Sequence, residues 1–452
     1  MSGGSEPRSR FPHPIALLVA CVFIAAAMSW VVPAGRYDRK DDPVTGRSVV
    51  VAGTYHRVEP APVGIFQAFV AIPKGLGDAA SVIFLVFVAG GAFTVVDQTG
   101  ALRRGVDWLA RRLDRREAVV IPVVCLAFAA GGALENMQEE IIAMVPVLLI
   151  LCRRLGYDAV TACAISVGAA AVGSAFSPIN PFQVGIAQNL AHVTLLSGGA
   201  FRSAALAVAL AVWIGGTLRY ARRTRTAATG PGFDAETPFG VRQAGVLVLV
   251  VATFGGFVYG VMALGWDFDQ MSALFLAMGL AAGLLGGLGV SGTANSLAAG
   301  FSAMAYAGVL IGVARAVYVV MDQGRIIDTV VYGLFTPIAH LPVALAAVGM
   351  MVAQAAIHVP VPSVSGQAVL TMPVLAPLSD LLGLSRQVMI LSYQFGAGLC
   401  ELLTPTNGGL MAILAAAGVR YESWARFCGP LYLLLAGVGV VAILAGIAMG
   451  LQ

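Results

Sequence analysis

Two short segments carry the residues best placed to do chemistry, and they share a pattern. Residues 177–181 read Ser-Pro-Ile-Asn-Pro and residues 404–409 read Thr-Pro-Thr-Asn-Gly-Gly, and each interrupts a long apolar run. Proline removes a backbone N–H and clashes with the preceding turn, so a helix must end or kink there and leave carbonyl groups without partners. Inside a bilayer such a break is tolerated only where protein covers it or where it lines a polar cavity. The two breaks are therefore predicted to form two halves of one binding site.

The breaks offer hydroxyl and amide groups beside unwound backbone. Oxygens in this arrangement suit Na⁺, whereas the N-terminus of a half-helix suits an anionic group. The expected substrate-binding residues are Ser177, Asn180, Thr404, Thr406 and Asn407. A Na⁺ ion is expected at Ser177, Asn180, Thr404 and Asn407. Local capping of the broken helices by the same side chains is the alternative, and the sequence leaves it open.

Ionisable side chains are rare in the apolar stretches, and those present mark further candidate sites. A charge near the bilayer centre costs roughly 2.5 to 3.5 kcal/mol on insertion scales, so each one that persists suggests a function. A polar tip at 135–140 reads Glu-Asn-Met-Gln-Glu-Glu, and a glutamate at 401 precedes the second break. Helix-end capping or contact with water is the alternative for the glutamates of the tip. The residues expected to bind a coupling cation or proton are Glu135, Glu139, Glu140, Glu401 and His358.

Arg315 is predicted to be the arginine that lies deepest within a membrane helix. A guanidinium there suits a substrate carboxylate. An internal salt bridge with Glu401 or Asp97 is the alternative. Further substrate-binding residues are expected at the two polar tips: Asn136, Ser363 and Ser365.

Composition indicates the elements that must position these residues. The 452 residues are 58% apolar and only 11% charged, and windows of apolar residues follow one another with short polar joins. About 20 apolar residues cross the ~30 Å of hydrocarbon in a bilayer, so the chain is predicted to be a polytopic membrane protein with the bilayer as its environment and no nucleic-acid partner. The apolar run at 14–32 is expected to be a signal-anchor helix with the amino terminus in the cytoplasm. The six scattered cysteines show no CxxC spacing, so no metal or disulfide role is expected.

Polar tips divide two apolar regions into halves too short to cross comfortably. We therefore expect re-entrant hairpins at about 117–154 and about 341–382. Basic residues flank the first hairpin on both sides, which indicates that it opens from the cytoplasm. Arginines recur between residues 103 and 116 together with leucines at helical spacing, so an amphipathic surface helix is expected there.

The chain also repeats itself. An offset of 227 residues aligns Pro178 with Pro405 and Asn180 with Asn407, and the same offset aligns the two hairpins. We expect a first repeat at 1–218, a cytoplasmic linker at 219–243 and a second repeat at 244–452. In the second repeat an additional span at 272–288 reverses the orientation, and a small-residue stretch then precedes a span at 309–321. The predicted fold class is an all-α polytopic membrane protein with inverted repeats, two re-entrant helical hairpins and two broken transmembrane helices.

The sequence resembles the YfcC-like branch of the four-carbon dicarboxylate carrier (DcuC-like) family, within the ion transporter superfamily. The resemblance covers nearly the whole chain. It rests on His13-Pro14, Trp-Val-Val-Pro-Ala-Gly at 30–35, Phe-Leu-Val-Phe-Val-Ala-Gly-Gly-Ala-Phe at 84–93, Ala314-Arg315-Ala316 and the two Ser/Thr-Pro-x-Asn breaks. It implies a homodimeric carrier of the bacterial inner membrane, in which a transport domain moves against a scaffold as an elevator. Relatives are linked to dicarboxylates and to amino acids such as arginine and ornithine. Better-known members of the superfamily have Ser-Asn-Thr at both hairpin tips, and this chain does not.

The expected function is secondary active transport of a small carboxylate-bearing metabolite, an amino acid or a dicarboxylate, by alternating access. Transport is expected to be coupled to Na⁺ or H⁺, or to proceed by exchange, without a cofactor. Several carboxylates against one deep arginine favour an amino acid, and a basic amino acid antiporter of the arginine/ornithine type is the named alternative. An enzyme is not expected, because the sequence offers neither a nucleophile with its base nor a paired aspartate motif. A passive channel is the other class left open.

Overall fold

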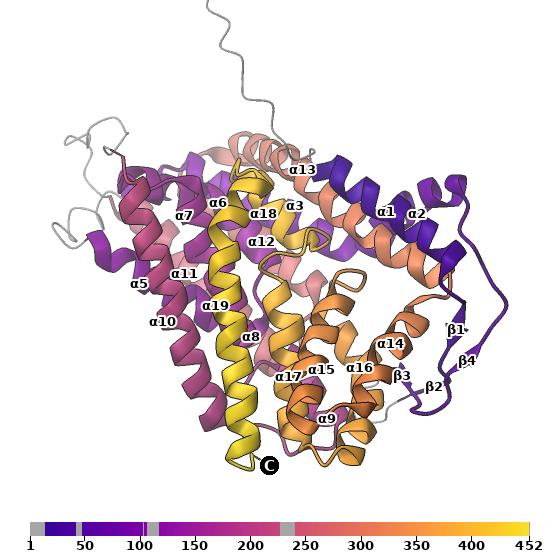
Figure 1. The fold of residues 1–452 in the computed structure, drawn as a ribbon. Coiled ribbons are helices and arrows are strands. Elements are labelled where there is room, and N and C mark those ends of the chain that lie inside the picture. The colour runs from indigo at the N-terminus through magenta and orange to yellow at the C-terminus, as the bar shows by residue number, and fades with distance from the viewer. Residues whose placement is uncertain (1–13, 42–47, 103, 106–116, 227–239, 452) are drawn as a thin grey trace, which may run out of the picture.

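The structure is a computed structural model, and it describes residues 14–41, 48–102, 104–105, 117–226 and 240–451. Within these residues the chain is mostly helical (Figure 1). Six of the described helices are long and apolar enough to cross a membrane. They are α1 (Pro14–Val31), α3 (Ala80–Gln98), α10 (Gly199–Thr224), α12 (Phe268–Leu285), α13 (Gly289–Gln323) and α19 (Tyr421–Ala448). The prediction of an all-α polytopic membrane protein is confirmed.

Two helical hairpins lie where the sequence has its polar tips. Hairpin 1 comprises α5 (Glu117–Glu135) and α6 (Glu139–Arg154), and hairpin 2 comprises α15 (Val343–His358) and α16 (Val364–Leu381). Asn136 turns the chain of hairpin 1 with a φ of 59°, a left-handed conformation that asparagine tolerates better than most residues. Arg153 and Arg154 end α6, where their charges favour the negative end of the helix dipole.

Both Ser/Thr-Pro-x-Asn segments break a helix. Before the first break lie α7 (Ala159–Cys163), a π-helical turn (Ala164–Gly168) and α8 (Ala169–Ala175), and after it lie a second π-helical turn (Pro181–Gly185) and α9 (Ile186–Leu190). The second break separates α17 (Arg386–Cys400) from α18 (Gly408–Ala416). In each case an asparagine caps the segment that follows. The Asn180 side chain accepts hydrogen bonds from the Phe182 and Gln183 N–H groups, and the Asn407 side chain accepts one from the Leu410 N–H. This capping satisfies donors that have no partner within the helix.

The two halves of the chain repeat one packing scheme. The segment after the first break starts at Pro181, and α18 starts at Gly408, which is the offset of 227 residues seen in the sequence. α5 packs on α8 as α15 packs on α17, and α10 packs on α8 as α19 packs on α17. We call this group, α5–α10 with α15–α19, the hairpin unit.

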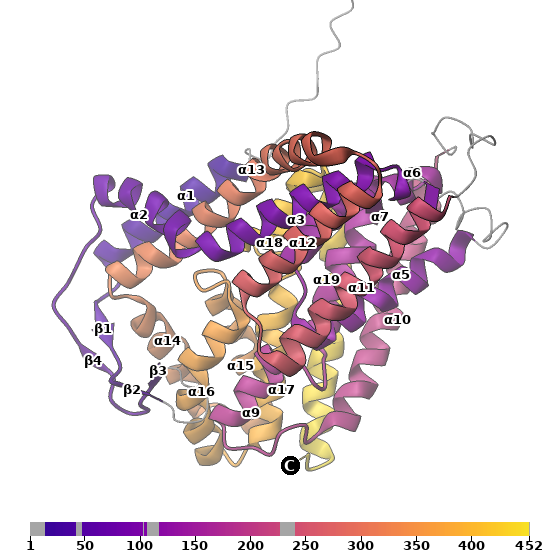
Figure 2. The ribbon, with the colours of Figure 1, turned by 180° about the vertical axis from the view of Figure 1, so that it is seen from behind.

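The remaining long helices form a second group, the scaffold. It comprises α1, α2 (Ile65–Asp78), α3, α11 (Val241–Leu264), α12 and α13. α13 packs along α1, α2 and α3, and α12 packs on α3 (Figure 2). Glycines allow this close approach, because a Cβ atom at Gly300 would lie 2.5 Å from the Cα atom of Gly91. The prediction of two separate elements before residue 321 is wrong. The small-residue stretch after residue 288 and the span at 309–321 form one continuous helix, α13. The stretch contains no proline, and its small residues pack closely on neighbouring helices.

The hairpin unit meets the scaffold where α6 packs on α3 and where α18 packs on α13. Hairpin 2 has different neighbours. It contacts α14 (Ile327–Phe335), which is followed by a short 3₁₀ turn (Thr336–His340), and α16 also packs on strand β3 (Ser48–Val50). The two hairpins are therefore held differently, although their sequences are related by the repeat.

Four short strands lie between α1 and α2. β1 (Gly35–Arg36) pairs with β4 (His56–Arg57), and β2 (Arg39–Asp41) pairs with β3 (Ser48–Val50), both antiparallel. Asp328 of α14 accepts hydrogen bonds from the Tyr37 backbone N–H and from Arg39 Nη2, each at 3.0 Å. The Tyr55 ring stacks on Tyr332 with centroids 4.1 Å apart. The strands thus fasten α14 to the connection between α1 and α2.

The predicted linker starts too early. α10 continues to Thr224, beyond the expected end of the first repeat at 218, because its basic last turn suits a helix C-terminus. α11 begins at Val241, and the residues between 227 and 239 lie outside the described part of the chain. Most of the predicted amphipathic helix between residues 103 and 116 also lies outside it.

Candidate functional site

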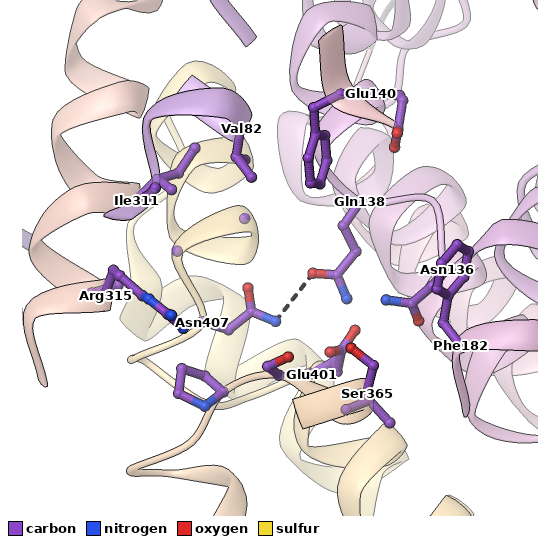
Figure 3. Close-up of a pocket in the computed structure, with 18 of the residues that line it drawn as sticks. Val82, Asn136, Gln138, Glu140, Phe182, Ile311, Arg315, Ser365, Glu401 and Asn407 are labelled. Carbon is purple, nitrogen blue, oxygen red and sulfur yellow. Dashed lines mark hydrogen bonds between the residues drawn. The ribbon is translucent and has the colours of Figure 1, made fainter. Parts of the chain in front are cut away.

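A cavity of about 660 Å³ lies between the hairpin unit and the scaffold (Figure 3). The hairpin unit contributes Asn136, Gln138, Glu140, Phe182, Val361, Pro362, Ser363, Val364, Ser365, Glu401, Thr406, Asn407, Gly408 and Gly409. The scaffold and its loops contribute Asp78, Ala79, Val82, Phe257, Gly265, Trp266, Asp267, Phe268, Met271, Ile311, Ala314, Arg315 and Tyr318. A cavity of this size suits a small metabolite.

Three helices of the hairpin unit begin at the cavity wall. α6 follows Gln138, α16 follows Ser363 and α18 follows Asn407, and all three of these residues line the cavity. Ser363 Oγ accepts a hydrogen bond from the Gly366 N–H at 3.2 Å, which caps α16. Because the N-terminus of a helix carries partial positive charge, the three ends together favour a negative group in the cavity.

The second break supplies Glu401, Thr406 and Asn407 to the cavity. Glu401 is only 4% exposed, and it ends the first half of the broken helix. Thr406 Oγ donates to the carbonyl of Val359 in hairpin 2 at 2.5 Å, so the break and the hairpin tip are joined. Asn407 Nδ2 donates to Gln138 Oε1 at 3.1 Å, which joins the second break to hairpin 1. Parts of both repeats thus meet at one cavity.

Hairpin 1 contributes Asn136, Gln138 and Glu140, of which Gln138 is 5% exposed and Glu140 is 7% exposed. Gln138 was not among the expected site residues, although it stands in the polar tip whose other members were. Glu135 ends α5 and Glu139 begins α6, and their side chains lie outside what the structure describes. Their predicted coupling role stays a prediction.

Arg315 belongs to the scaffold wall, and its side chain is 41% exposed. Its Nε lies 3.9 Å from Asp78 Oδ2, and its guanidinium lies 4.5 Å from the centre of the Tyr318 ring. The acidic partner is therefore Asp78, which the sequence did not suggest, rather than Glu401 or Asp97, the partners named in the alternative interpretation of Arg315. Arg315 is not the most buried arginine of the described chain. Arg202 in α10 is fully buried and bonds to Ser197, Gln387 and Gln394.

Four predicted residues are buried but do not line the cavity: Ser177, Asn180, His358 and Thr404. Ser177 Oγ donates to the Ala133 carbonyl and accepts from the backbone N–H of Asn180. Asn180 accepts from two backbone N–H groups, and its Nδ2 donates to the Gly132 carbonyl at 2.9 Å. His358 Nδ1 is 3.1 Å from Gln367 Oε1 inside hairpin 2. At the first break these contacts are those of helix capping, the alternative that the sequence left open.

The charges in the cavity are unequal. Its lining holds four carboxylates, from Asp78, Glu140, Asp267 and Glu401, and one guanidinium, from Arg315. Asp267 caps α12 by accepting a hydrogen bond from the Phe268 N–H at 2.8 Å. A low-dielectric cavity with an excess of one charge attracts ligands of the opposite charge. Among the described His, Cys, Asp and Glu side chains, none form a group of three that could hold a metal ion.

The sequence matches the family model DcuC, described as the C4-dicarboxylate anaerobic carrier, over residues 11–448. A protein of Escherichia coli named putative basic amino acid antiporter YfcC is 30% identical over 99% of this chain and 98% of its own length. An uncharacterized protein of Haemophilus influenzae is 28% identical over 97% of each chain. Among solved structures, the YdaH transporter of Alcanivorax borkumensis is 16% identical with a TM-score of 0.47, over 97% of this chain and 99% of that one.

Proposed function

The chain belongs to the DcuC family, in its YfcC-like branch, and from this membership we propose that it is a secondary transporter of a basic amino acid. The family is one of membrane carriers, and the chain is a multi-pass membrane protein. The E. coli relative carries the name of a putative basic amino acid antiporter, which agrees with this proposal.

The observation that carries the proposal is the excess of carboxylates in the cavity. Glu140 and Glu401 line this cavity and are almost fully buried, so their negative charges lie close to any ligand that binds there. Arg315 lies on the opposite wall beside Asp78. A substrate with two cationic groups and one carboxylate brings net positive charge to this cavity, as arginine, lysine and ornithine do.

A C4 dicarboxylate is the second candidate, because the family description names it. The three helix N-termini and Arg315 favour its carboxylates. It would bring two further negative charges beside four carboxylates, so it would have to bind together with protons or cations.

Transport is proposed to proceed by alternating access, with the hairpin unit moving as an elevator along the scaffold of a homodimer. The contacts of α6 with α3 and of α18 with α13 are those that must be exchanged during this motion. Exchange of one amino acid for another, or coupling to H⁺ or Na⁺, supplies the driving force, with Glu140 and Glu401 as the coupling residues. The proposed location is the bacterial inner membrane with the amino terminus in the cytoplasm, which places Arg153 and Arg154 on the positive-inside face.

Counterflow in proteoliposomes tests the proposal. Vesicles containing the purified protein are loaded with unlabelled L-arginine, L-ornithine or succinate and diluted into labelled L-arginine or, in a parallel series, labelled succinate. Each series is run with and without a Na⁺ gradient and with a protonophore. Accumulation in vesicles loaded with basic amino acids is expected. Counterflow of labelled succinate without any of labelled arginine would show the dicarboxylate function instead, and ohmic currents in planar bilayers would indicate a channel.

A further inference from the structure

We propose that Asn136 and Gln138 bind the carboxylate of the substrate through their amide N–H groups, and that Asn180 and Asn407 of the two breaks hold these amides in the binding orientation. For the identity of the substrate, this inference rests on the proposed function. It assigns the carboxylate to the tip of hairpin 1 rather than to Arg315.

The orientation of Gln138 follows from a backbone group. The Leu410 N–H donates to Asn407 Oδ1 at 3.0 Å, so Asn407 presents its Nδ2 to hairpin 1. This Nδ2 donates to Gln138 Oε1 at 3.1 Å. The acceptor end of Gln138 is thereby occupied, and its Nε2 donor is buried without a hydrogen-bond partner in the described chain. A buried donor without a partner is unfavourable, and a bound acceptor would relieve it.

The orientation of Asn136 follows from the first break in the same way. The Phe182 and Gln183 N–H groups donate to Asn180 Oδ1 at 2.9 and 3.0 Å, so Asn180 Nδ2 is the end that reaches Ser174 Oγ, at 3.4 Å. The Ser174 hydroxyl then donates to Asn136 Oδ1, which also accepts from Gln183 Nε2 at 2.9 Å. With its oxygen occupied twice, Asn136 turns its Nδ2 to the cavity.

The two donors converge on one place. Figure 3 shows the amide nitrogens of Asn136 and Gln138 pointing into the same part of the cavity. Amide N–H groups bind anions and neutral acceptors and repel cations, so the ligand group here is an acceptor and not an ammonium or a metal ion. In the proposed substrate that acceptor is the carboxylate. The N-terminus of α6, which follows Gln138, adds partial positive charge at the same place.

Other charged side chains of the cavity suit the rest of the substrate. Glu140 and Glu401 line the same cavity and suit the cationic groups of the substrate. In an α-amino acid the amine stands one carbon from the carboxylate, so an acceptor site and a donor site side by side match it. Arg315 stands on the scaffold near Asp78 and does not belong to the unit that is proposed to move with the substrate.

Two nearly isosteric substitutions test the site. Gln138→Glu keeps an oxygen that accepts from Asn407 Nδ2 and replaces the unpartnered amide N–H₂ by a charged oxygen. Asn136→Asp likewise keeps an oxygen that accepts from the Ser174 hydroxyl and replaces the amide N–H₂ by a charged oxygen. Binding of L-arginine and of agmatine, which is arginine without its carboxylate, is measured by titration calorimetry on the purified protein. Gln98→Glu is the matched control, because Gln98 is exposed at the end of α3 and does not line the cavity. Thermal melting without ligand checks that each variant is folded.

The native protein is expected to bind L-arginine more tightly than agmatine. In Gln138→Glu the ratio of the two dissociation constants should shift toward agmatine by about 10- to 100-fold, because a hydrogen bond to a charged group is lost. Agmatine binding should persist, and Asn136→Asp should act in the same direction. Equal binding of arginine and agmatine by the native protein, or equal loss of both in the variants, would overturn the carboxylate site while leaving the proposed function intact. Binding of succinate but of neither amine, abolished by Gln138→Glu, would support the carboxylate site and overturn the basic amino acid as substrate.

Discussion

Gly408 begins α18 at the contact between the hairpin unit and the scaffold, and Gly408→Ala tests whether that contact requires a bare backbone. A Cβ atom at this position would lie 2.8 Å from the Cα atom of Ile311 in α13 and 3.4 Å from the Cβ atom of Ala314. The residue one repeat earlier is Pro181, so the glycine is a feature of the second break alone.

The structure allows an estimate of the cost. Carbon atoms in contact prefer about 3.5–4.0 Å, so the added methyl group overlaps a backbone atom by roughly 1 Å. A flexible side chain would turn away, but the Cα atom moves only with its helix. Overpacking of this kind costs about 1–3 kcal/mol when the neighbours have to shift. Here the neighbours can separate, so α18 and α13 are expected to move apart.

Two measurements follow. The thermal unfolding midpoint of the purified variant should fall, and the rate of amino acid counterflow should fall with it, because the contact of α18 with α13 joins the two units. Gly215→Ala in α10 is the control, since a Cβ atom there would meet no atom within 4 Å. In that variant the better helix propensity of alanine, worth up to about 1 kcal/mol, should leave stability unchanged or raise it.

A second variant sharpens the test. Ile311→Ala shortens the neighbouring side chain but leaves its Cα atom in place, so the pair Gly408→Ala with Ile311→Ala should be no more stable than Gly408→Ala alone. Recovery of stability in the pair would show that a side chain, and not the backbone, limits the approach. Unchanged stability in Gly408→Ala itself would refute the close contact altogether.

Three further substitutions have defined expectations. Glu401→Gln removes a buried carboxylate from the cavity and should reduce the rate of arginine counterflow about 10-fold or more, while the thermal unfolding midpoint stays unchanged. Counterflow at the native rate would show that Glu401 takes part in neither binding nor coupling. Asn180→Ala removes a helix cap and the hydrogen bond to the Gly132 carbonyl, and should lower the free energy of unfolding by about 2–4 kcal/mol in denaturation experiments. A small loss of stability, together with a change in the Na⁺ dependence of transport, would instead support the predicted Na⁺ site at Asn180. Arg315→Ala should change the free energy of unfolding by less than about 1 kcal/mol, because the ion pair with Asp78 is long and partly exposed. The variant should still bind arginine more tightly than agmatine. Loss of that preference in calorimetry would show that Arg315 binds the substrate carboxylate.

The membrane class, the hairpins and the broken helices could be predicted from the sequence, because each leaves a local mark. Apolar length identifies the spans, and Pro with Asn marks both a broken helix and its cap, as at Pro178 and Asn180. The length of α13 could not be predicted in the same way. Its first half is rich in small residues, so its hydropathy did not indicate a membrane-spanning helix. We attribute its helical conformation to close packing against α2 and α3.

The site was harder to predict than the fold, because whether a polar side chain lines the cavity depends on contacts between residues far apart in the sequence. The break residues Ser177 and Asn180 have the right chemistry, but backbone groups occupy their polar atoms, whereas Asn407 also reaches the cavity. Asp78 is the ion-pair partner of Arg315, although it ends a different helix far away in the chain. Gln138 carried the one signal available in the sequence, its place in the polar tip, but its free donor becomes evident only once Asn407 is seen to occupy its oxygen.

The length of α13 also has a consequence for the lipid around the protein. Its 35 residues correspond to about 52 Å of helix, against a hydrocarbon layer of ~30 Å. In Figure 1 α13 is strongly inclined relative to α10 and α19, so α13 and these two helices cannot all stand parallel to the membrane normal. α1, α2 and α3 pack along this inclined helix, so a change in its tilt would have to involve them as well. Hydrophobic mismatch costs fractions of a kcal/mol per ångström and varies with acyl chain length. Bilayer thickness should therefore shift the balance between transport states in reconstituted vesicles, even with the binding cavity unaltered.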